Sequence, residues 1–182
     1  GEYLITLNMP DKVVMTALNG NPLIQRGTAQ WMAAVAEGQE AIYTVELMRT
    51  GAVSLKLKNI IGATVVLNGS LESVEMKDAG KGLFSADKLA PDTYTAVVKL
   101  PAGRYEYDET KWTLTETADG MTATASVTVK AGKSASLAGI PRNTVGSVSG
   151  TIRDMDGSAM QGVSVTICDE NGQTAATVET DK

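Results

Sequence analysis

The sequence predicts an all-β protein made of tandem antiparallel β-sandwich modules. Short segments in which apolar and polar residues alternate predict strands, because a period of two places one face in a core and the other in water. Asn-Gly and Asp-Gly pairs between these segments predict tight hairpin turns, because both pairs tolerate positive φ. A long internal repeat predicts that the sandwich occurs more than once.

The alternating segments follow one another along the chain. In residues 53–58, Val53, Leu55 and Leu57 share one face and polar residues occupy the other. Similar segments lie at residues 41–47, 93–98, 123–129 and 163–167, with turn pairs at 19–20, 68–69, 119–120, 156–157 and 171–172. Many short strands at this spacing are typical of an antiparallel sandwich.

Residues 28–40 are ambiguous, because their composition suits a helix. Their counterpart in the repeat, residues 111–121, is rich in Thr and reads as a strand and hairpin. The shared register indicates that both form the same element. We therefore predict strand for both, with a helix over 28–40 as the alternative, since tertiary context overrides propensity.

The repeat defines the domain organisation. Residues 1–3, residues 10–11 and Trp31 match residues 82–84, residues 91–92 and Trp112 at an offset of 81. Residues 51–54 and 62–67 in turn resemble residues 146–149 and 162–167. The predicted organisation is the second half of a module at 1–49, a complete module at 50–140, a linker at 141–145 and the first half of a third module at 146–182.

Composition excludes several classes of function. The net charge of −5, without a basic stripe, argues against a nucleic-acid partner. No apolar run reaches the roughly 18 residues of a membrane-spanning helix, so we expect no membrane insertion.

The sequence also lacks the groups that most catalytic sites need. Without histidine there is no Ser-His-Asp triad and no zinc site built on imidazole. There is no Gly-rich phosphate-binding loop of the Walker or Rossmann type. The single cysteine, Cys168, ends a predicted strand and has no imidazole to activate it. We predict no catalytic residues, no enzyme activity and no cofactor.

Acidic residues near turns raise the question of calcium. An EF-hand-like loop that starts at Asp154 requires Glu at its twelfth position, where Val165 stands. Asp154, Asp156 and residues 169–171 therefore read as turn residues, and we predict no metal site, with calcium as the open alternative. Glu72 and Glu75 read as residues on solvated strand faces or turns.

The middle of the chain carries a family pattern. Residues 82–84, residues 89–95 and Pro101-Ala102-Gly103-Arg104-Tyr105 resemble the Gly-x-Tyr-x-Phe, Leu-x-Pro-Gly-x-Tyr and Pro-x-Gly-Tyr motifs of Cna B-type modules, also called SdrD B-like or carboxypeptidase-regulatory-like. Residues 150–167 resemble the opening of the same module. The resemblance implies a prealbumin-like or Ig-like sandwich of about seven strands, used in tandem by adhesins and stalks of Gram-positive bacteria.

The resemblance also implies an internal Lys–Asn or Lys–Asp isopeptide crosslink, but the required residues are missing. Lys56 or Lys58 supplies an amine in the complete module, yet Val98 stands where the assisting acid is needed. Residues 123–129, taken as the last strand, contain no Asn or Asp, and Ser149 stands at the lysine position of the third module. We predict no isopeptide bond.

Four aromatic residues are candidates for special roles. Phe84 and Tyr94 are large side chains in a chain with few aromatics, so we predict that they anchor the core. Trp31 and Trp112 recur at one offset, which predicts a shared packing role; contact with a ligand such as a sugar is the alternative.

These observations predict a non-catalytic structural repeat, a stalk or spacer of a large protein on the bacterial cell surface, extracellular and attached to a Gram-positive wall. The alternatives are an adhesin module that binds host protein or glycan, and an accessory domain of a secreted enzyme. The expected partners are adjacent repeats of the same protein. We also expect residues 1–47 of one copy to pair head to tail with residues 146–182 of another, because each half leaves strand edges unpaired.

Overall fold

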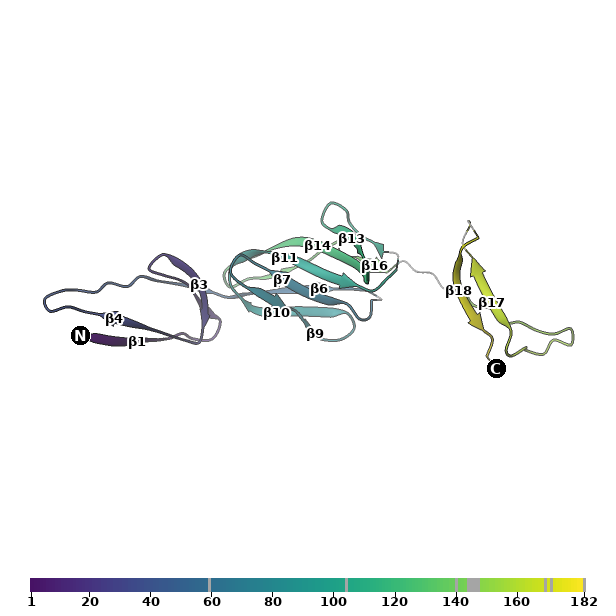
Figure 1. Cartoon of the computed structure of the whole chain (residues 1–182), viewed down its shortest axis with the longest axis horizontal. Coiled ribbons are helices and arrows are strands. Elements are labelled where there is room, and N and C mark those ends of the chain that lie inside the picture. Colours follow the sequence, from purple (N-terminus) through teal and green to yellow (C-terminus); the bar gives the residue numbers. More distant parts are fainter. Residues whose placement is uncertain are drawn as a thin grey trace. The chain divides into compact units, whose positions relative to one another are not determined.

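The computed structural model describes residues 1–58, 60–103, 105–139, 141–143, 148–168, 170 and 172–181. Every regular element among these residues is a strand, so the predicted all-β class is confirmed (Figure 1). The chain divides into two compact units, Gly1–Val145 and Gly146–Lys182. Within the described part of the chain, no helix is long and apolar enough to cross a membrane.

Residues 51–143, which we call the central sandwich, form two main sheets over one core. The strand orders are β15-β6-β10-β9 and β13-β14-β11-β7-β8. The strands are β6 Gly51–Lys56, β7 Thr64–Asn68, β8 Ser73–Glu75, β9 Lys77–Asp78, β10 Leu83–Leu89, β11 Asp92–Leu100, β12 Tyr105–Glu106, β13 Thr113–Thr117, β14 Gly120–Val129, β15 Ser134–Ser136 and β16 Arg142–Asn143. β12 and β16 form a separate antiparallel pair.

The core of the central sandwich follows the alternation in the sequence. Val53, Leu55 and Leu57 are at most 1% exposed, whereas their neighbours on the strand reach toward solvent. Phe84 and Tyr94 both lie in this core, at 4% and 0% exposure. The inward side chains of the two sheets thus form one continuous apolar layer.

One strand pairing differs from the predicted antiparallel pattern. β15 runs parallel to β6, with Ser134 opposite Ala52 and Ser136 opposite Ser54. The prediction that residues 123–129 form the last strand of the module is therefore wrong. After β14 the chain turns at Lys130 and crosses to the other sheet, where it forms β15. This strand has only three residues, two of them Ser, and is too short and too polar to show a strand pattern in the sequence. This strand also lacks Asn and Asp.

The N-terminal segment, residues 1–49, forms two small sheets. β1 (Glu2–Asn8) pairs with β4 (Thr28–Ala34), and β2 (Val13–Leu18) lies between β3 (Asn21–Arg26) and β5 (Val45–Arg49). Asn19 and Gly20 both have positive φ in the β2–β3 turn, as the Asn-Gly pair predicts. The strand prediction is confirmed for Thr28–Ala34, and the helix alternative is wrong.

The N-terminal segment nevertheless pairs its strands differently from the central sandwich. β10 pairs with β6, but its repeat counterpart β1 pairs with β4. Trp112 precedes β13, which pairs with β14, whereas Trp31 lies within β4 itself. Residues 28–40 and 111–121 thus each contain a strand, as predicted, but the two strands pair with different partners. No strand equivalent to β6 flanks β1 within this segment, and β4 takes that position.

This rearrangement corrects one further expectation. Residues 41–44 are irregular, although their alternation predicts a strand from residue 41. β2 lies between β3 and β5, but β1 is paired on one edge only, by β4, so the outer strands of both small sheets keep an unpaired edge. Head-to-tail pairing between copies therefore stays a prediction.

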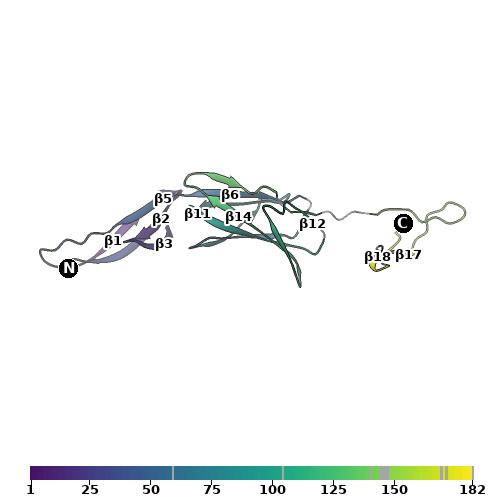
Figure 2. The same cartoon turned by 90° about the horizontal axis from the view of Figure 1, so that it is seen from above.

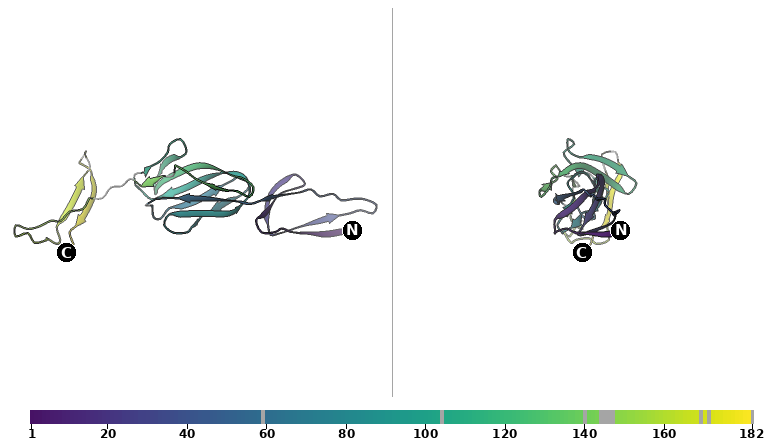
Figure 3. Two further views of the ribbon diagram at one scale, coloured as in Figure 1. Left: turned by 180° about the vertical axis from the view of Figure 1, so that it is seen from behind. Right: turned by 90° about the vertical axis from the view of Figure 1, so that its left-hand side faces the viewer.

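The two strands among the described residues of the second unit form one hairpin. β17 (Ser164–Cys168) pairs with β18 (Thr174–Glu179), and an isolated bridge joins Arg153 to Ala159 in the preceding loop (Figure 3). The hairpin repeats the pairing of β7 with β8. None of the described residues in this unit is buried, and Val165 and Ile167 are only half-buried. A lone two-stranded hairpin of this kind has marginal stability in water.

We predict that an isolated fragment of residues 50–143 folds on its own. Its two sheets share one core, and the fragment retains β16, which pairs with β12. Far-UV circular dichroism is expected to show a β spectrum with one cooperative thermal transition. A helical spectrum, or the absence of a transition, would contradict this independence.

Candidate functional site at the junction before the central sandwich

The N-terminal segment and the central sandwich are joined by one residue. β5 ends at Arg49 and β6 begins at Gly51, so Thr50 alone connects them (Figure 2). Thr50 is 8% exposed, and its N–H donates to the Lys12 carbonyl at 2.9 Å. A Cβ at position 51 would stand 2.6 Å from the Lys133 carbonyl oxygen, so only glycine fits there. The chain therefore passes from one fold to the next without a loop.

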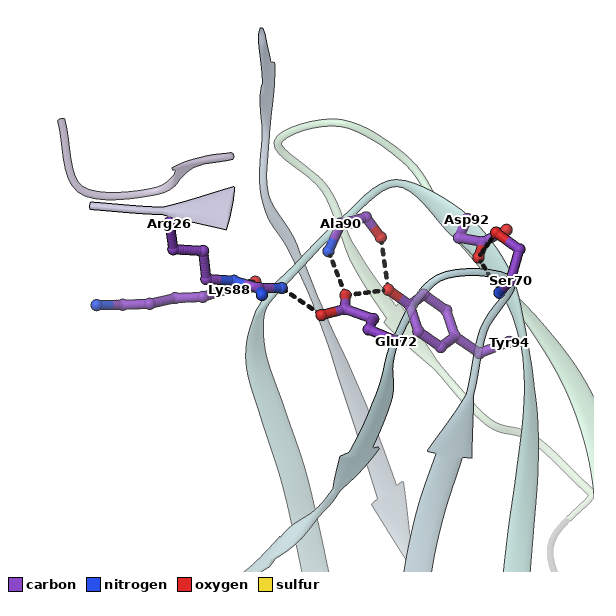
Figure 4. A network of polar contacts seen from close by, with 7 residues as sticks. All are labelled: Arg26, Ser70, Glu72, Lys88, Ala90, Asp92 and Tyr94. Carbon is purple, nitrogen blue, oxygen red and sulfur yellow. Dashed lines mark hydrogen bonds and ion pairs between the residues drawn. The ribbon is translucent and has the colours of Figure 1, made fainter. Parts of the chain in front are cut away.

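A nearly buried carboxylate joins the two sides of this junction (Figure 4). Glu72, just before β8, has a side chain only 11% exposed, and its Oε2 accepts a hydrogen bond from Arg26 Nη2 at 2.5 Å. Its Oε1 accepts from the Tyr94 hydroxyl at 2.5 Å and from the Ala90 N–H at 2.9 Å. The same hydroxyl lies 2.9 Å from the Ala90 carbonyl oxygen. Glu72 lies in the turn between β7 and β8, as one of the two predicted settings has it, but the prediction that its side chain is solvated is wrong.

The surroundings hold Glu72 and Tyr94 in complementary protonation states. Burial is the largest influence on the pKa of Glu72 and raises it, but hydrogen bonds from Tyr94, Ala90 and Arg26 together outweigh burial and lower it. Burial, followed by the Glu72 carboxylate, raises the pKa of Tyr94. At neutral pH the carboxylate therefore accepts hydrogen bonds and the phenol donates one.

A bulge in β10 supplies the second link. The register of β10 against β6 shifts between Ala86 and Leu89, and Lys88 in this bulge has a φ of 57°. The Lys88 carbonyl accepts from Arg26 Nε at 3.0 Å. Lys88 Nζ lies 2.7 Å from Asp11 Oδ1, where the hydrogen bond and the lysine charge lower the pKa of Asp11. The bulge thus directs both the carbonyl and the amine of Lys88 toward the N-terminal segment.

The repeat explains why Asp11 is available for this contact. Its counterpart Asp92 accepts hydrogen bonds from the Ser70 N–H at 2.6 Å and the Ser70 hydroxyl at 2.8 Å. Those bonds fix the turn between β7 and β8, and the N-terminal segment contains no such hairpin beside β2. At the same position of the repeat, Asp92 therefore fixes an internal turn, whereas Asp11 reaches across the junction to Lys88.

A cleft of about 630 Å³ opens beside the connection. Residues 10–13 and 49–50 form one wall, and residues 51–52, 87–88 and 132–134 form the other. Its volume lies within the range of roughly 300–1,000 Å³ typical of small-molecule sites. The junction therefore combines a nearly buried polar network with an open cavity.

The two tryptophans are not brought together at one site. Trp112 is 2% exposed, and its Nε1 donates to the Ala138 carbonyl at 3.2 Å. Trp31 is half-buried, its ring lies 5.9 Å from that of Tyr43, and its buried Nε1 has no partner among the described residues. Trp112 presents no ring face to solvent, whereas Trp31 retains a partly open one.

The acidic turn residues of the second unit serve the local backbone. Asp154 Oδ1 accepts from the N–H groups of Asp156 at 3.0 Å and Ser158 at 2.8 Å. Residues 169 and 171, named with them as calcium candidates, lie outside the described residues. Within the described ranges, no group of three or more His, Cys, Asp or Glu side chains is placed to hold a metal ion.

Sequence reasoning finds only part of the junction. Tyr94 stands out as a large side chain within a family motif, but Arg26, Glu72 and Lys88 carry no signal. Glu72 is 46 residues from Arg26, and in the sequence each of the two resembles an ordinary surface charge. Comparison with protein-family models, with curated proteins and with solved structures found no match.

We predict that Glu72 and Tyr94 stabilise the first unit as a pair. Glu72→Gln and Tyr94→Phe should each lower the free energy of unfolding by about 1–2 kcal/mol, because each leaves a nearly buried partner unsatisfied. The double variant should lose at least about 0.5 kcal/mol less than the sum. Urea unfolding at pH 7, followed by tryptophan fluorescence, measures all three, with the exposed Glu75→Gln as control. Strict additivity would argue against the network.

We also predict a specific loss of stability in acid. The pKa of Glu72 is lower in the folded protein than the roughly 4.3 of an unfolded chain. Its contribution is therefore complete above the unfolded pKa and is lost as pH falls through the folded value. The difference in melting temperature between the unsubstituted protein and Glu72→Gln should stay constant from pH 7 to pH 5 and shrink below about pH 4. A difference independent of pH would refute this assignment.

Proposed function

We propose that the chain is a non-catalytic structural repeat, a stalk or spacer of a large extracellular protein on a Gram-positive bacterial surface. The observation that carries this proposal is the junction at Thr50, where adjacent folds share a one-residue connection and a polar network. A short, bonded junction suits a protein that must hold a distant binding region away from a wall. The resemblance to Cna B-type repeats supports the same proposal.

A ligand-binding adhesin module is the second candidate. The cleft beside Thr50 favours it, because its volume suits a small ligand. The half-buried Trp31 next to Tyr43 is a further candidate contact for a host protein or glycan. Both features are compatible with a spacer that also binds a ligand.

The spacer proposal predicts a stiff junction. Spin labels on Cys residues introduced at the exposed positions 34 and 126, in a Cys168→Ser background, report on the two sides. Electron–electron double resonance should give one narrow distance distribution. Arg26→Ala combined with Glu72→Gln should broaden it, and Glu75→Gln should not. A broad distribution in the protein without junction substitutions would mean a hinge and would contradict the spacer role.

A further inference from the structure

The cleft beside Thr50 collects positive charge in an acidic protein. Lys12 and Arg49 come from the N-terminal segment, and Lys88 and Lys133 come from the central sandwich. Asp11 and Asp87 are the acidic residues of the lining, so four cations face two anions, a local charge of +2. The whole chain carries −5.

Three of these four cations have no ion-pair partner among the described residues. Lys88 is paired with Asp11, but Lys12, Arg49 and Lys133 form no salt bridge there. Like charges confined to one cleft repel one another, and an anion between them removes that repulsion. The fixed walls therefore favour a negatively charged occupant.

Thr50 adds a neutral hydrogen-bond donor at the same place. Thr50 is buried, and it lines the cleft. Its hydroxyl has no hydrogen-bond partner among the described residues, although its N–H is bonded to Lys12. The hydroxyl is not sealed from solvent, so it can donate a hydrogen bond to a ligand oxygen in the cleft.

The position of Arg49 fits the same role. Its Cδ lies 3.6 Å from where a Cβ of Gly132 would stand, so its aliphatic stem packs on the turn that carries Lys133. Arg49 therefore reaches from its own wall to the turn of the other wall that carries Lys133. A planar guanidinium binds carboxylate, sulfate and phosphate oxygens in a bidentate manner.

We propose that this cleft binds a small multivalent anion, a molecule with two or more carboxylate, sulfate or phosphate groups. Arg49 and Lys133, one from each wall, bind one anionic group, Lys12 binds another, and the Thr50 hydroxyl donates to an oxygen between them. A monovalent anion neutralises only one cation, so multivalent ligands bind more tightly. None of the described residues that line the cleft is aromatic, which disfavours neutral sugars.

The test is isothermal titration of the full chain with citrate, inorganic phosphate, inorganic sulfate and acetate in low-salt buffer. Citrate is expected to bind with one-to-one stoichiometry and at least about tenfold more tightly than acetate. Phosphate and sulfate are expected to lie between them, and their order identifies the preferred group. Failure of citrate to bind, or acetate binding as tightly as citrate, would overturn the proposal.

Paired variants separate a built site from diffuse attraction. Lys133→Glu should weaken citrate binding by about tenfold or more, whereas Lys130→Glu, three residues earlier and outside the lining, should change it by less than about twofold. Thr50→Val should weaken binding about fivefold, while Thr50→Ser and the exposed Thr95→Val should retain it.

Equal losses for the two lysine variants, or no loss for Thr50→Val, would mean that citrate responds only to net charge and would overturn the site. Circular dichroism confirms that each variant is folded, and Thr50→Ser keeps the test valid if Thr50→Val unfolds. A stiff junction without citrate binding would refute this site and leave the spacer role intact. Citrate binding to a protein with a mobile junction would support this site and contradict the spacer role.

Discussion

A connection of one residue between two folded regions leaves no slack, and the first unit is organised around that constraint. Thr50 must satisfy its backbone while buried, which it does through the Lys12 carbonyl. Gly51 must approach the Lys133 carbonyl more closely than any side chain permits. Once these two positions are fixed, the β2–β3 hairpin meets the start of β11, and the polar groups there must find partners across the boundary. Arg26 and Glu72 are the result.

Two segments with related sequences use the same residues for different purposes. Asp92 fixes a turn and Asp11 pairs with Lys88; Trp112 bonds to Ala138, and Trp31 has no such acceptor among the described residues. Both differences have one cause. Ser70, which binds Asp92, follows β7, and Ala138, which binds Trp112, follows β15. The N-terminal segment contains no counterpart of either strand. A repeated sequence therefore specifies local strands, while the neighbours decide how each strand is paired.

This distinction also explains what could be predicted from the sequence. Alternation identified the strands of the central core, including Val53 to Leu57, and Asn19-Gly20 forms the expected hairpin turn. Strand pairing is harder to predict from the sequence, because it depends on which strand edges are free. Neither the pairing of β4 with β1 nor the parallel pairing of the short β15 with β6 has a local sequence signal. The junction was the least accessible part. Its charged residues are scattered over residues 11–88, and no local pattern separates the nearly buried Glu72 from the exposed Glu75.

The polar contacts at the junction differ in how strongly they can set its geometry. Lys88 and Asp11 are half-exposed or more, and such a pair is screened by water and salt. Glu72 is shielded and is held in place by Tyr94 and Ala90 on its own side, and separation of the two sides would remove its hydrogen bond from Arg26. The network around Glu72 is therefore the element that fixes the orientation. An anion in the cleft would add to it in a concentration-dependent way, because a ligand held by both walls stabilises only the arrangement in which the walls face each other.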